Sequence, residues 1–525
     1  MVMDEPKIIN KDVVVIGAGI SGLATLKCLK DAGLSAVVLE RTSEVGGLWT
    51  FREDDYGVMR FTHINVSKYN YCFSDFPFPD DTPDYPHNTD MAQYIVNYVK
   101  HFNLEDDISY LRKVISVERT AEVWQTTVKH VEDDGKTIDD NQPVEIYRSK
   151  FIAVATGHHA KPSLAEFPGQ NSFKGEIIHS VKFNDAITNG MTGKRVLIVG
   201  IGNSAVDAAV NCASVGRCKS VYISTRSGAW VVPNYIFGHP TDLYACRLFF
   251  WLPFALANLI FGTVISLISG HPKRWKLNPK MKPLQSQPTV SPTLIHHIQR
   301  RNIKIVPNIQ RIEGSKVYFS DGDSAEFDHI VLCTGYKIDL PFLSEDIQQT
   351  VLNKETNEIK LYKNVFSPDI GSSLAFIGFV QPASGGVLTM SELQARWFAH
   401  LCINQIQLPS KSDMLETMEK EKEFCANKYY KSTRHTIQRD PIVYNDEIAE
   451  MIGAKPSLKN NLGLAWRLML SSCGAYQWRL EGPNKWDGAK KAVKKVPLTE
   501  LMNYSALLVV ALLGLFVCYL YSFLF

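Results

Sequence analysis

Two glycine-rich turns constrain what this chain can fold into more than any other feature of its sequence. A β-branched run at 13–16 leads into Gly17-Ala18-Gly19-Ile20-Ser21-Gly22, and a second run at 196–199 leads into Gly200-Ile201-Gly202-Asn203-Ser204-Ala205. Glycines at this spacing let the backbone approach a pyrophosphate, while the following helix N-terminus offers N–H donors. One such turn is weak evidence, but two in the right frame of strand and helix are strong. The chain is therefore predicted to be an α/β protein with two Rossmann-like dinucleotide-binding domains.

The residues that follow each turn distinguish the two predicted sites. The strand at 36–39 ends in Glu40, whose carboxylate can accept hydrogen bonds from ribose hydroxyls and suits FAD or NAD. The strand at 220–224 ends without a carboxylate and is followed by Arg226, which suits a 2′-phosphate. We therefore expect FAD at the first site and NADPH at the second. The N–H groups expected to meet the NADPH pyrophosphate are those of Ser204, Ala205, Val206 and Asp207.

A third motif precedes the second turn and carries a family resemblance. Residues 173–183 read Phe-x-Gly-x-x-x-His-x-x-x-Phe, and this string ahead of a glycine turn resembles the flavin-containing monooxygenases. Further stretches match the animal members of that family in order, at residues 40–49, 65–68, 72–79, 155–159, 224–230, 333–336, 391–394 and 482–489. The related Baeyer–Villiger enzymes carry Trp where this chain has Phe183, and this difference of pattern favours the monooxygenases that act on nitrogen and sulfur.

The resemblance implies a reaction and a set of site residues. In the family, NADPH reduces FAD, and the reduced flavin captures O₂ as a C4a-hydroperoxide. A nucleophilic nitrogen or sulfur of a lipophilic small molecule then takes the distal oxygen. Asn65 matches the family's asparagine beside the flavin and nicotinamide, where an amide can both donate and accept hydrogen bonds. The other cofactor contacts that the resemblance implies are Leu48, Trp49, Ile64, Val66 and Gln381.

Two alternatives stay open at this point. The same fold can serve Baeyer–Villiger oxidation of ketones or an uncoupled NADPH oxidase that yields hydrogen peroxide. A catalytically silent membrane protein could keep the fold for binding alone, but the intact glycines, Glu40, Asn65 and Arg226 argue against it. His179 is expected to make structural hydrogen bonds rather than to act in catalysis, and His158-His159 is expected to lie in a loop.

Length and composition bound the domain organisation and the partners. A chain of 525 residues exceeds what one core usually serves. We expect a discontinuous FAD-binding domain at 1–185 and 326–495, and an NADPH-binding domain at 186–325 with an apolar insert at about 235–295. The 56 basic against 54 acidic residues give no basic field for nucleic acid. The ten cysteines include no CxxC pair, which argues against a zinc site and fits a reducing compartment. The oligomeric state stays open.

Two apolar stretches predict contact with membrane lipid. Tyr504–Phe525 carries no charge and is long enough for a bilayer core of roughly 30 Å, so 496–525 is predicted to be a C-terminal transmembrane anchor. The lysines that precede it favour a catalytic body on the cytosolic side, at Lys490, Lys491, Lys494 and Lys495. With the resemblance to the animal family, this predicts a tail-anchored protein of the endoplasmic reticulum membrane.

The second stretch, Leu248–Ile268, lies inside the expected NADPH domain. A spanning helix there would split that domain across the membrane, so an interfacial segment is the preferred interpretation. Its prominent apolar side chains are Trp251, Phe254, Ile260, Phe261 and Ile265, and the basic residues that follow are Lys273, Arg274 and Lys276. A hydrophobic subdomain buried against the body is the alternative.

Overall fold

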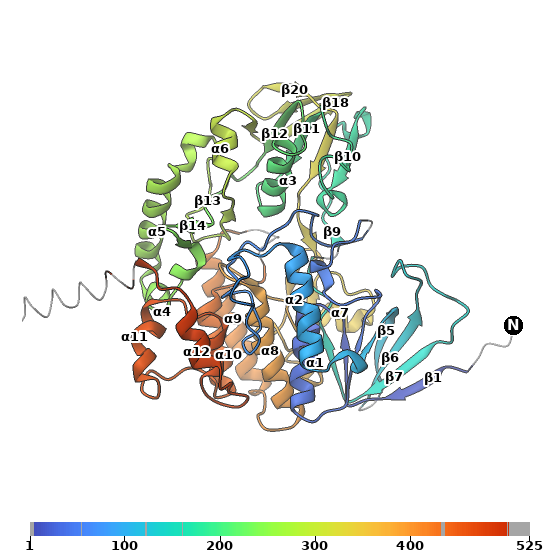
Figure 1. Ribbon diagram of the computed structural model, residues 1–525. Coiled ribbons are helices and arrows are strands. Elements are labelled where there is room, and N and C mark those ends of the chain that lie inside the picture. Colours follow the sequence, from blue (N-terminus) through green and yellow to red (C-terminus); the bar gives the residue numbers. More distant parts are fainter. Residues whose placement is uncertain are drawn as a thin grey trace, which may run out of the picture.

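Two parallel five-stranded sheets form the centre of the computed structural model, which describes residues 5–53, 55–120, 123–159, 161–431, 436–500, 502 and 504 (Figure 1). The first sheet has the order β25 (Leu374–Phe376), β8 (Phe151–Val154), β2 (Val13–Ile16), β3 (Ala36–Leu39) and β4 (Ile108–Ser109). The second has the order β10 (Glu176–His179), β21 (His329–Leu332), β11 (Arg195–Val199), β12 (Ser220–Ser224) and β17 (Ile303–Val306). Both glycine turns follow a central parallel strand and open a helix, as predicted.

The first sheet is built from distant parts of the chain. Strand β25 pairs with β8 although more than two hundred residues separate them, and α1 (Ile20–Asp31) packs against α8 (Val387–Cys402). The inner strands β2 and β3 are buried along their whole length, because helices cover one face and a further sheet covers the other. That further sheet has the order β1 (Lys7–Asn10), β7 (Glu145–Ser149), β6 (Val123–His130) and β5 (Arg112–Thr120).

The second sheet extends beyond the expected 186–325 range. Its strands β10 and β21 lie on either side of that range in the sequence, and β21 inserts between the edge strand β10 and the central strand β11. Helices α3 (Asn203–Ala213) and α6 (Leu294–Gln299) cover one face. The sequence around β21 repeats the pattern of β8, and the expected boundary at 326 assigned it to the first domain. That assignment was wrong for β21, because a local pattern does not determine which strands pair.

The insert lies between the two nucleotide folds rather than on the second alone. It contains β13 (Val231–Val232) at its edge, η5 (Thr241–Tyr244), α4 (Arg247–Trp251), α5 (Phe254–Ser269) and β16 (Thr289–Val290). The buried Arg247 guanidinium pairs with Asp446 of α10 (Pro441–Met451) at 2.7 Å and donates to the Gln477 amide oxygen at 2.6 Å. Helix α4 also packs on α11 (Leu462–Leu470). The insert therefore bridges the second nucleotide fold to the C-terminal helices of the first.

The two apolar stretches have different outcomes. Among the described residues, no helix is both long and apolar enough to cross a bilayer. Helix α5, with 16 residues, accounts for most of Leu248–Ile268, which agrees with its rejection as a spanning helix. The predicted anchor beyond Tyr504 lies outside the described residues.

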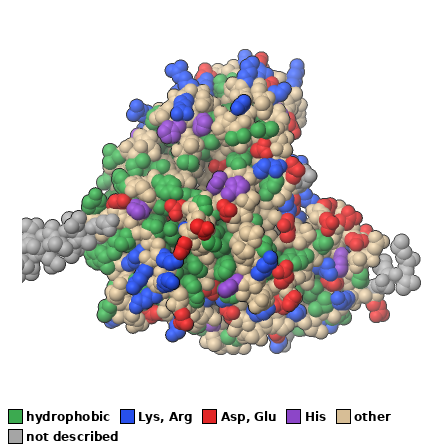
Figure 2. Space-filling model, viewed as in Figure 1, with side chains coloured by type: hydrophobic (Ala, Val, Ile, Leu, Met, Phe, Trp, Pro, Cys, Tyr) green, Lys and Arg blue, Asp and Glu red, His purple; other side chains and the backbone are tan. Residues whose placement is uncertain are grey.

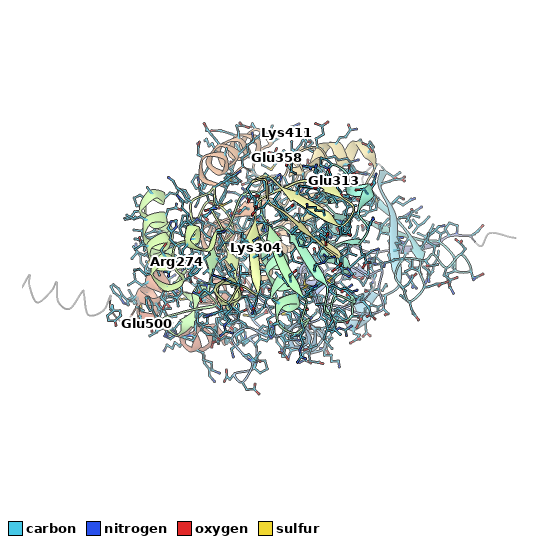
Figure 3. All side chains as sticks on the ribbon, turned by 90° about the horizontal axis from the view of Figure 1, so that it is seen from above. Arg274, Lys304, Glu313, Glu358, Lys411 and Glu500 are labelled. Carbon is cyan, nitrogen blue, oxygen red and sulfur yellow. The ribbon has the colours of Figure 1, made fainter. Side chains whose placement is uncertain are left out.

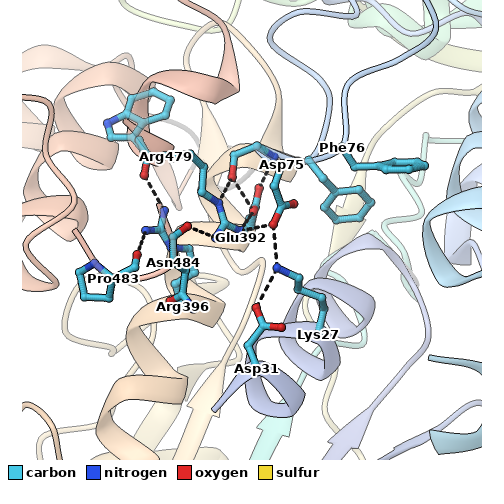
Figure 4. Close-up of polar contacts among 12 residues, drawn as sticks. Lys27, Asp31, Asp75, Phe76, Glu392, Arg396, Arg479, Pro483 and Asn484 are labelled. Carbon is cyan, nitrogen blue, oxygen red and sulfur yellow. Dashed lines mark hydrogen bonds and ion pairs between the residues drawn. The ribbon is translucent and has the colours of Figure 1, made fainter. Parts of the chain in front are cut away.

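A buried network of charges holds the C-terminal segment in the core of the first fold (Figure 4). Arg479 is 1% exposed and contacts the carboxylates of Glu392 at 2.6 Å and Asp75 at 3.0 Å. Asp75 in turn pairs with Lys27 of α1 at 2.7 Å. Because buried charges are costly unless they are paired, removing one member leaves its partner uncompensated. The network thus fixes α1, α8 and the residue 72–79 loop relative to one another.

Candidate functional site

The first glycine turn has the close backbone approaches that its glycines predict. Gly17 adopts φ +103°, and a Cβ on Gly22 would lie 1.8 Å from the Gly17 carbonyl oxygen, so no other residue fits at Gly22. Glu40 is buried at the end of β3. Its carboxylate accepts hydrogen bonds from the Ala18 N–H at 2.7 Å and from the Thr42 N–H at 2.9 Å. It therefore lies against the turn, where its remaining lone pairs fit ribose hydroxyls.

The second glycine turn opens onto a cleft of about 480 Å³. Gly200 adopts φ +126° against the Cys333 carbonyl, and Gly202 is the N-cap of α3. Ser204, Ala205 and Arg226 line the cleft, together with Gln381 from the other fold. Its charged lining residues are Arg226, Lys280 and Lys431, and no Asp or Glu of the described chain lines it. The donor set of a helix N-terminus plus cations fits a phosphate-rich dinucleotide.

A smaller cavity of about 190 Å³ joins the two folds. Leu48, Trp49 and Asn65 line it from the first fold, while Ser204 and Asp207 line it from α3 of the second. It shares several lining residues with the cleft: His159, Ser180, Asn203, Ser204 and Tyr336. The Asn65 side chain makes no hydrogen bond to the described part of the chain, so its donor and acceptor remain available there. This is where groups bound by the two folds would meet.

Asp207 lines the shared cavity, which its position after the second glycine turn did not indicate. The expectation that its backbone N–H meets the pyrophosphate was wrong, because this N–H lies in the second turn of α3 and bonds within the helix, as those of Ala205 and Val206 do with the Gly202 carbonyl. The residue instead lines the shared cavity. Burial raises the pKa of its carboxyl to about 7, and within the described chain no hydrogen bond or ion pair offsets this. The carboxyl therefore changes charge near neutral pH at the junction of the two folds.

The remaining expected residues divide into buried and cleft-lining groups. Ile64, Val66 and Val206 are core side chains, at most 6% exposed, and line neither space. Packing of the site walls, rather than direct contact in the cavity, is the role their positions support. Gln381 lines the cleft and donates to the Gln287 amide oxygen of the insert at 2.8 Å.

The structure also places residues in the site that the sequence gave no reason to choose. His159 and Tyr336 line both spaces, and His158 lines the cleft, where burial lowers the pKa of its imidazole to about 4. Lys280 reaches the cleft from the insert. His158, His159 and Tyr336 fall in stretches that matched the family, at 155–159 and 333–336, but nothing in those stretches marked them as site residues, and no local signal marks Lys280. His179 makes structural hydrogen bonds to Gly335 and Val181, as expected.

Comparison with known proteins agrees with this geometry. Human flavin-containing monooxygenase 5 is 36% identical, over 92% of this chain and 91% of its own length. Dimethylaniline monooxygenase [N-oxide-forming] 2 of Oryctolagus cuniculus is 34% identical, with the same coverage of each chain. A cyclohexanone-bound structure of cyclohexanone monooxygenase has the same fold, with a TM-score of 0.63 at 18% identity, over 85% of this chain and 98% of that one.

The family assignment rests on nearly the whole chain. Residues 10–501 match the family described as flavin-binding monooxygenase-like. The matched region includes both glycine turns, the cleft between the folds and the insert. The cofactors expected from Glu40 and Arg226 agree with those of this family. The chain therefore belongs to the flavin-binding monooxygenase-like family and is an FAD- and NADPH-dependent oxidoreductase.

Proposed function

We propose that this protein uses NADPH and O₂ to oxygenate a nucleophilic nitrogen or sulfur of lipophilic small molecules. Bound FAD supplies the redox and oxygen chemistry, which no side chain can provide. The protein binds the two nucleotides, orients them and keeps water from the place where they meet. One observation carries the proposal: Asn65 of the first fold and Ser204 and Asp207 of the second line a single small cavity.

The parts of the site have separate tasks in this proposal. The first glycine turn and Glu40 hold the FAD pyrophosphate and ribose, and the N-terminus of α3 holds the NADPH pyrophosphate. Arg226 selects NADPH through its 2′-phosphate. The Asn65 amide would act after the flavin is reduced, by offering a hydrogen-bond donor and an acceptor that limit the release of oxygen as hydrogen peroxide. No metal takes part in the proposal, and the described residues contain no cluster of metal ligands.

The test separates oxygen transfer from NADPH oxidation. Holoenzyme is incubated with NADPH, O₂ and N,N-dimethylaniline or a dialkyl sulfide, and the N-oxide or S-oxide, hydrogen peroxide and consumed NADPH are quantified together. We expect oxide formation to account for most of the NADPH consumed. Conversion of a ketone to an ester, without oxide, would identify Baeyer–Villiger chemistry instead, and peroxide alone would identify an oxidase.

Asn65→Ala tests the residue on which the proposal depends. We expect this variant to bind FAD and to accept hydride from NADPH at a rate near that of the wild type, because neither step needs the amide. Oxide formed per NADPH should fall about tenfold or more as peroxide rises, a loss in the range of one site hydrogen bond. Thr62→Ala, which alters another lining residue of the same cavity, is the matched control. Unchanged product yield in Asn65→Ala would remove Asn65 from this role.

We further propose that the protein is anchored in the endoplasmic reticulum membrane by its C-terminal segment, with the catalytic body in the cytosol. The supporting observation is an exposed apolar face on and around α5, which Figure 2 shows as hydrophobic side chains gathered on one side of the molecule. Its exposed members are Trp251, Leu256, Leu259, Ile260, Leu267 and Ile268. Lipophilic substrates would reach the site from this side. The orientation of Ile265 differs from expectation, since it is 1% exposed and packs with Val232 and Ile236.

A further inference from the structure

The return segment of the insert forms part of the wall of the nucleotide cleft. Strand β16 pairs with β13 next to the second glycine turn, and the Thr289 hydroxyl donates to the Ile201 carbonyl at 2.7 Å. The Val290 N–H donates to the Asn203 side-chain oxygen at 2.9 Å. The insert is thus attached directly to the residues that open α3, and its backbone position is fixed by the glycine turn.

The segment at 277–282 is attached to the turn that carries Arg226. The Lys280 N–H donates to the Ser227 carbonyl at 2.9 Å, and the Trp230 indole N–H donates to the Met281 carbonyl at 3.0 Å. Gly228 adopts φ +65°, and a Cβ there would lie 1.8 Å from the Leu277 carbonyl oxygen. The two backbones are therefore in direct contact, and only glycine permits this approach.

This contact brings a second cation to the place where Arg226 lies. Lys280 is bonded through its backbone to the residue that follows Arg226, and both residues line the cleft. Both are exposed, and no carboxylate of the described chain pairs with either. The third cation, Lys431, is attached elsewhere: the preceding Tyr430 N–H donates to the Gln285 carbonyl at 2.7 Å. Two unpaired cations against one wall suit a dianionic group better than a neutral one.

We propose that Lys280, supplied by the insert, is a second recognition residue for the NADPH 2′-phosphate and acts with Arg226 to select NADPH over NADH. The guanidinium of Arg226 offers a planar pair of donors, while the ammonium of Lys280 adds a point charge that adapts to the same phosphate. The inference rests on the assignment of Arg226 proposed above. The insert would then contribute to the selection of NADPH over NADH, whether or not it also contacts lipid.

Binding of nucleotide fragments tests this without relying on turnover. Full-length, FAD-loaded enzyme is titrated calorimetrically with 2′,5′-ADP, which carries the 2′-phosphate, and with 5′-AMP, which lacks it. We expect Lys280→Gln to weaken 2′,5′-ADP binding about fivefold at low salt and to leave 5′-AMP binding within twofold of the wild type. The difference between Lys280→Gln and the wild type should shrink as salt is raised, because the contact is exposed and ionic.

Lys282→Gln is the matched control, since Lys282 is an exposed lysine of the same segment that does not line the cleft. It should leave the binding of both fragments unchanged. Arg226→Ala distinguishes a failure of the Lys280 assignment from a failure of the Arg226 assignment. If Arg226→Ala weakens 2′,5′-ADP selectively but Lys280→Gln does not, the inference about Lys280 is wrong. If neither variant is selective, the 2′-phosphate site lies elsewhere and both assignments are overturned, whereas the oxygenation proposal stands on its own product assay.

Discussion

At the scale of single residues, burial shifts the pKa values of side chains at this site away from the values usual for their residue types. Asp207 is in the second turn of α3, where its backbone N–H bonds within the helix, yet the residue lines the shared cavity and burial raises the pKa of its carboxyl to about 7. Well below this pKa the carboxyl is neutral. As the pH rises through about 7 it becomes charged and would repel a bound pyrophosphate, so NADP⁺ affinity should fall over that range.

The corresponding prediction is that NADP⁺ binding by the wild type weakens by up to about tenfold per pH unit above 7, the limit for one linked proton. Asp207→Asn should remove this slope. Calorimetric titration of FAD-loaded wild type and Asp207→Asn with NADP⁺, from pH 6 to 8.5, measures the slope for each protein. The other titratable residues that line the cavity are His63, His159, Tyr56 and Tyr336. These residues are the same in the wild type and in Asp207→Asn, and the 2′-phosphate of the ligand titrates in both experiments. An identical slope in the two proteins would assign the pH dependence to one of those groups.

At the scale of elements, η5 of the insert positions the segment that carries Asn65. The Asp242 carboxylate accepts hydrogen bonds from the Ser67 N–H at 3.0 Å, the Ser67 hydroxyl at 2.6 Å and the Asn70 amide at 2.6 Å. All three donors belong to the first fold, so a short element of the insert fixes the Asn65 segment from outside.

Asp242→Ala should therefore loosen that segment and affect oxygen transfer as well as stability. We expect a free-energy cost of about 2 kcal/mol from the unpaired donors, and a higher ratio of peroxide to oxide at unchanged FAD content. Asp84→Ala is the control, because the Asp84 carboxylate accepts one hydrogen bond, from the hydroxyl of the exposed Tyr235 at 3.2 Å, and the backbone bond from Lys68 is kept in the variant. Thermal melting and the peroxide-to-oxide ratio are the measurements. Lower stability with an unchanged ratio would restrict Asp242 to a structural role.

At the scale of the whole molecule, the apolar face on α5 and the end of the described chain lie on one side. Arg274, just after α5, and Glu500 lie toward that side when the molecule is seen from above (Figure 3). Glu500 is held there by the Tyr244 hydroxyl at 2.6 Å and His239 at 3.2 Å, both from the insert. A surface of this kind binds lipid through its buried apolar area and through its attraction to anionic head groups.

Deleting Tyr504–Phe525 should accordingly leave a protein that still sediments with anionic phospholipid vesicles at high salt. Adding Leu256→Gln, Leu259→Gln and Leu267→Gln, at side chains that are 42%, 66% and 80% exposed, should release it into the supernatant. Leu164→Gln, Ile187→Gln and Val215→Gln, at exposed apolar positions of the described chain away from α5, should not. Monodisperse protein without detergent after the tail deletion alone would show that α5 does not bind lipid.

The sequence by itself determined the features that depend on neighbours along the chain. A strand, a glycine turn and a helix start are contiguous, so Gly17, Gly22 and Gly200 marked both nucleotide folds, and Glu40 and Arg226 indicated which cofactor suits each. The resemblance added Asn65, Leu48 and Trp49, which the structure places in one cavity.

Only the tertiary structure decided which distant residues meet. Asn65 and Asp207 share a cavity, β21 pairs within the second sheet, and Lys280 of the insert bonds through its backbone to the turn that carries Arg226. None of these has a local signature, because strand order and the burial of a side chain depend on residues far away in sequence. Ile265 is a further example. The sequence of α5 does not determine which face of the helix is exposed, and Ile265 is buried because it packs against Val232 and Ile236.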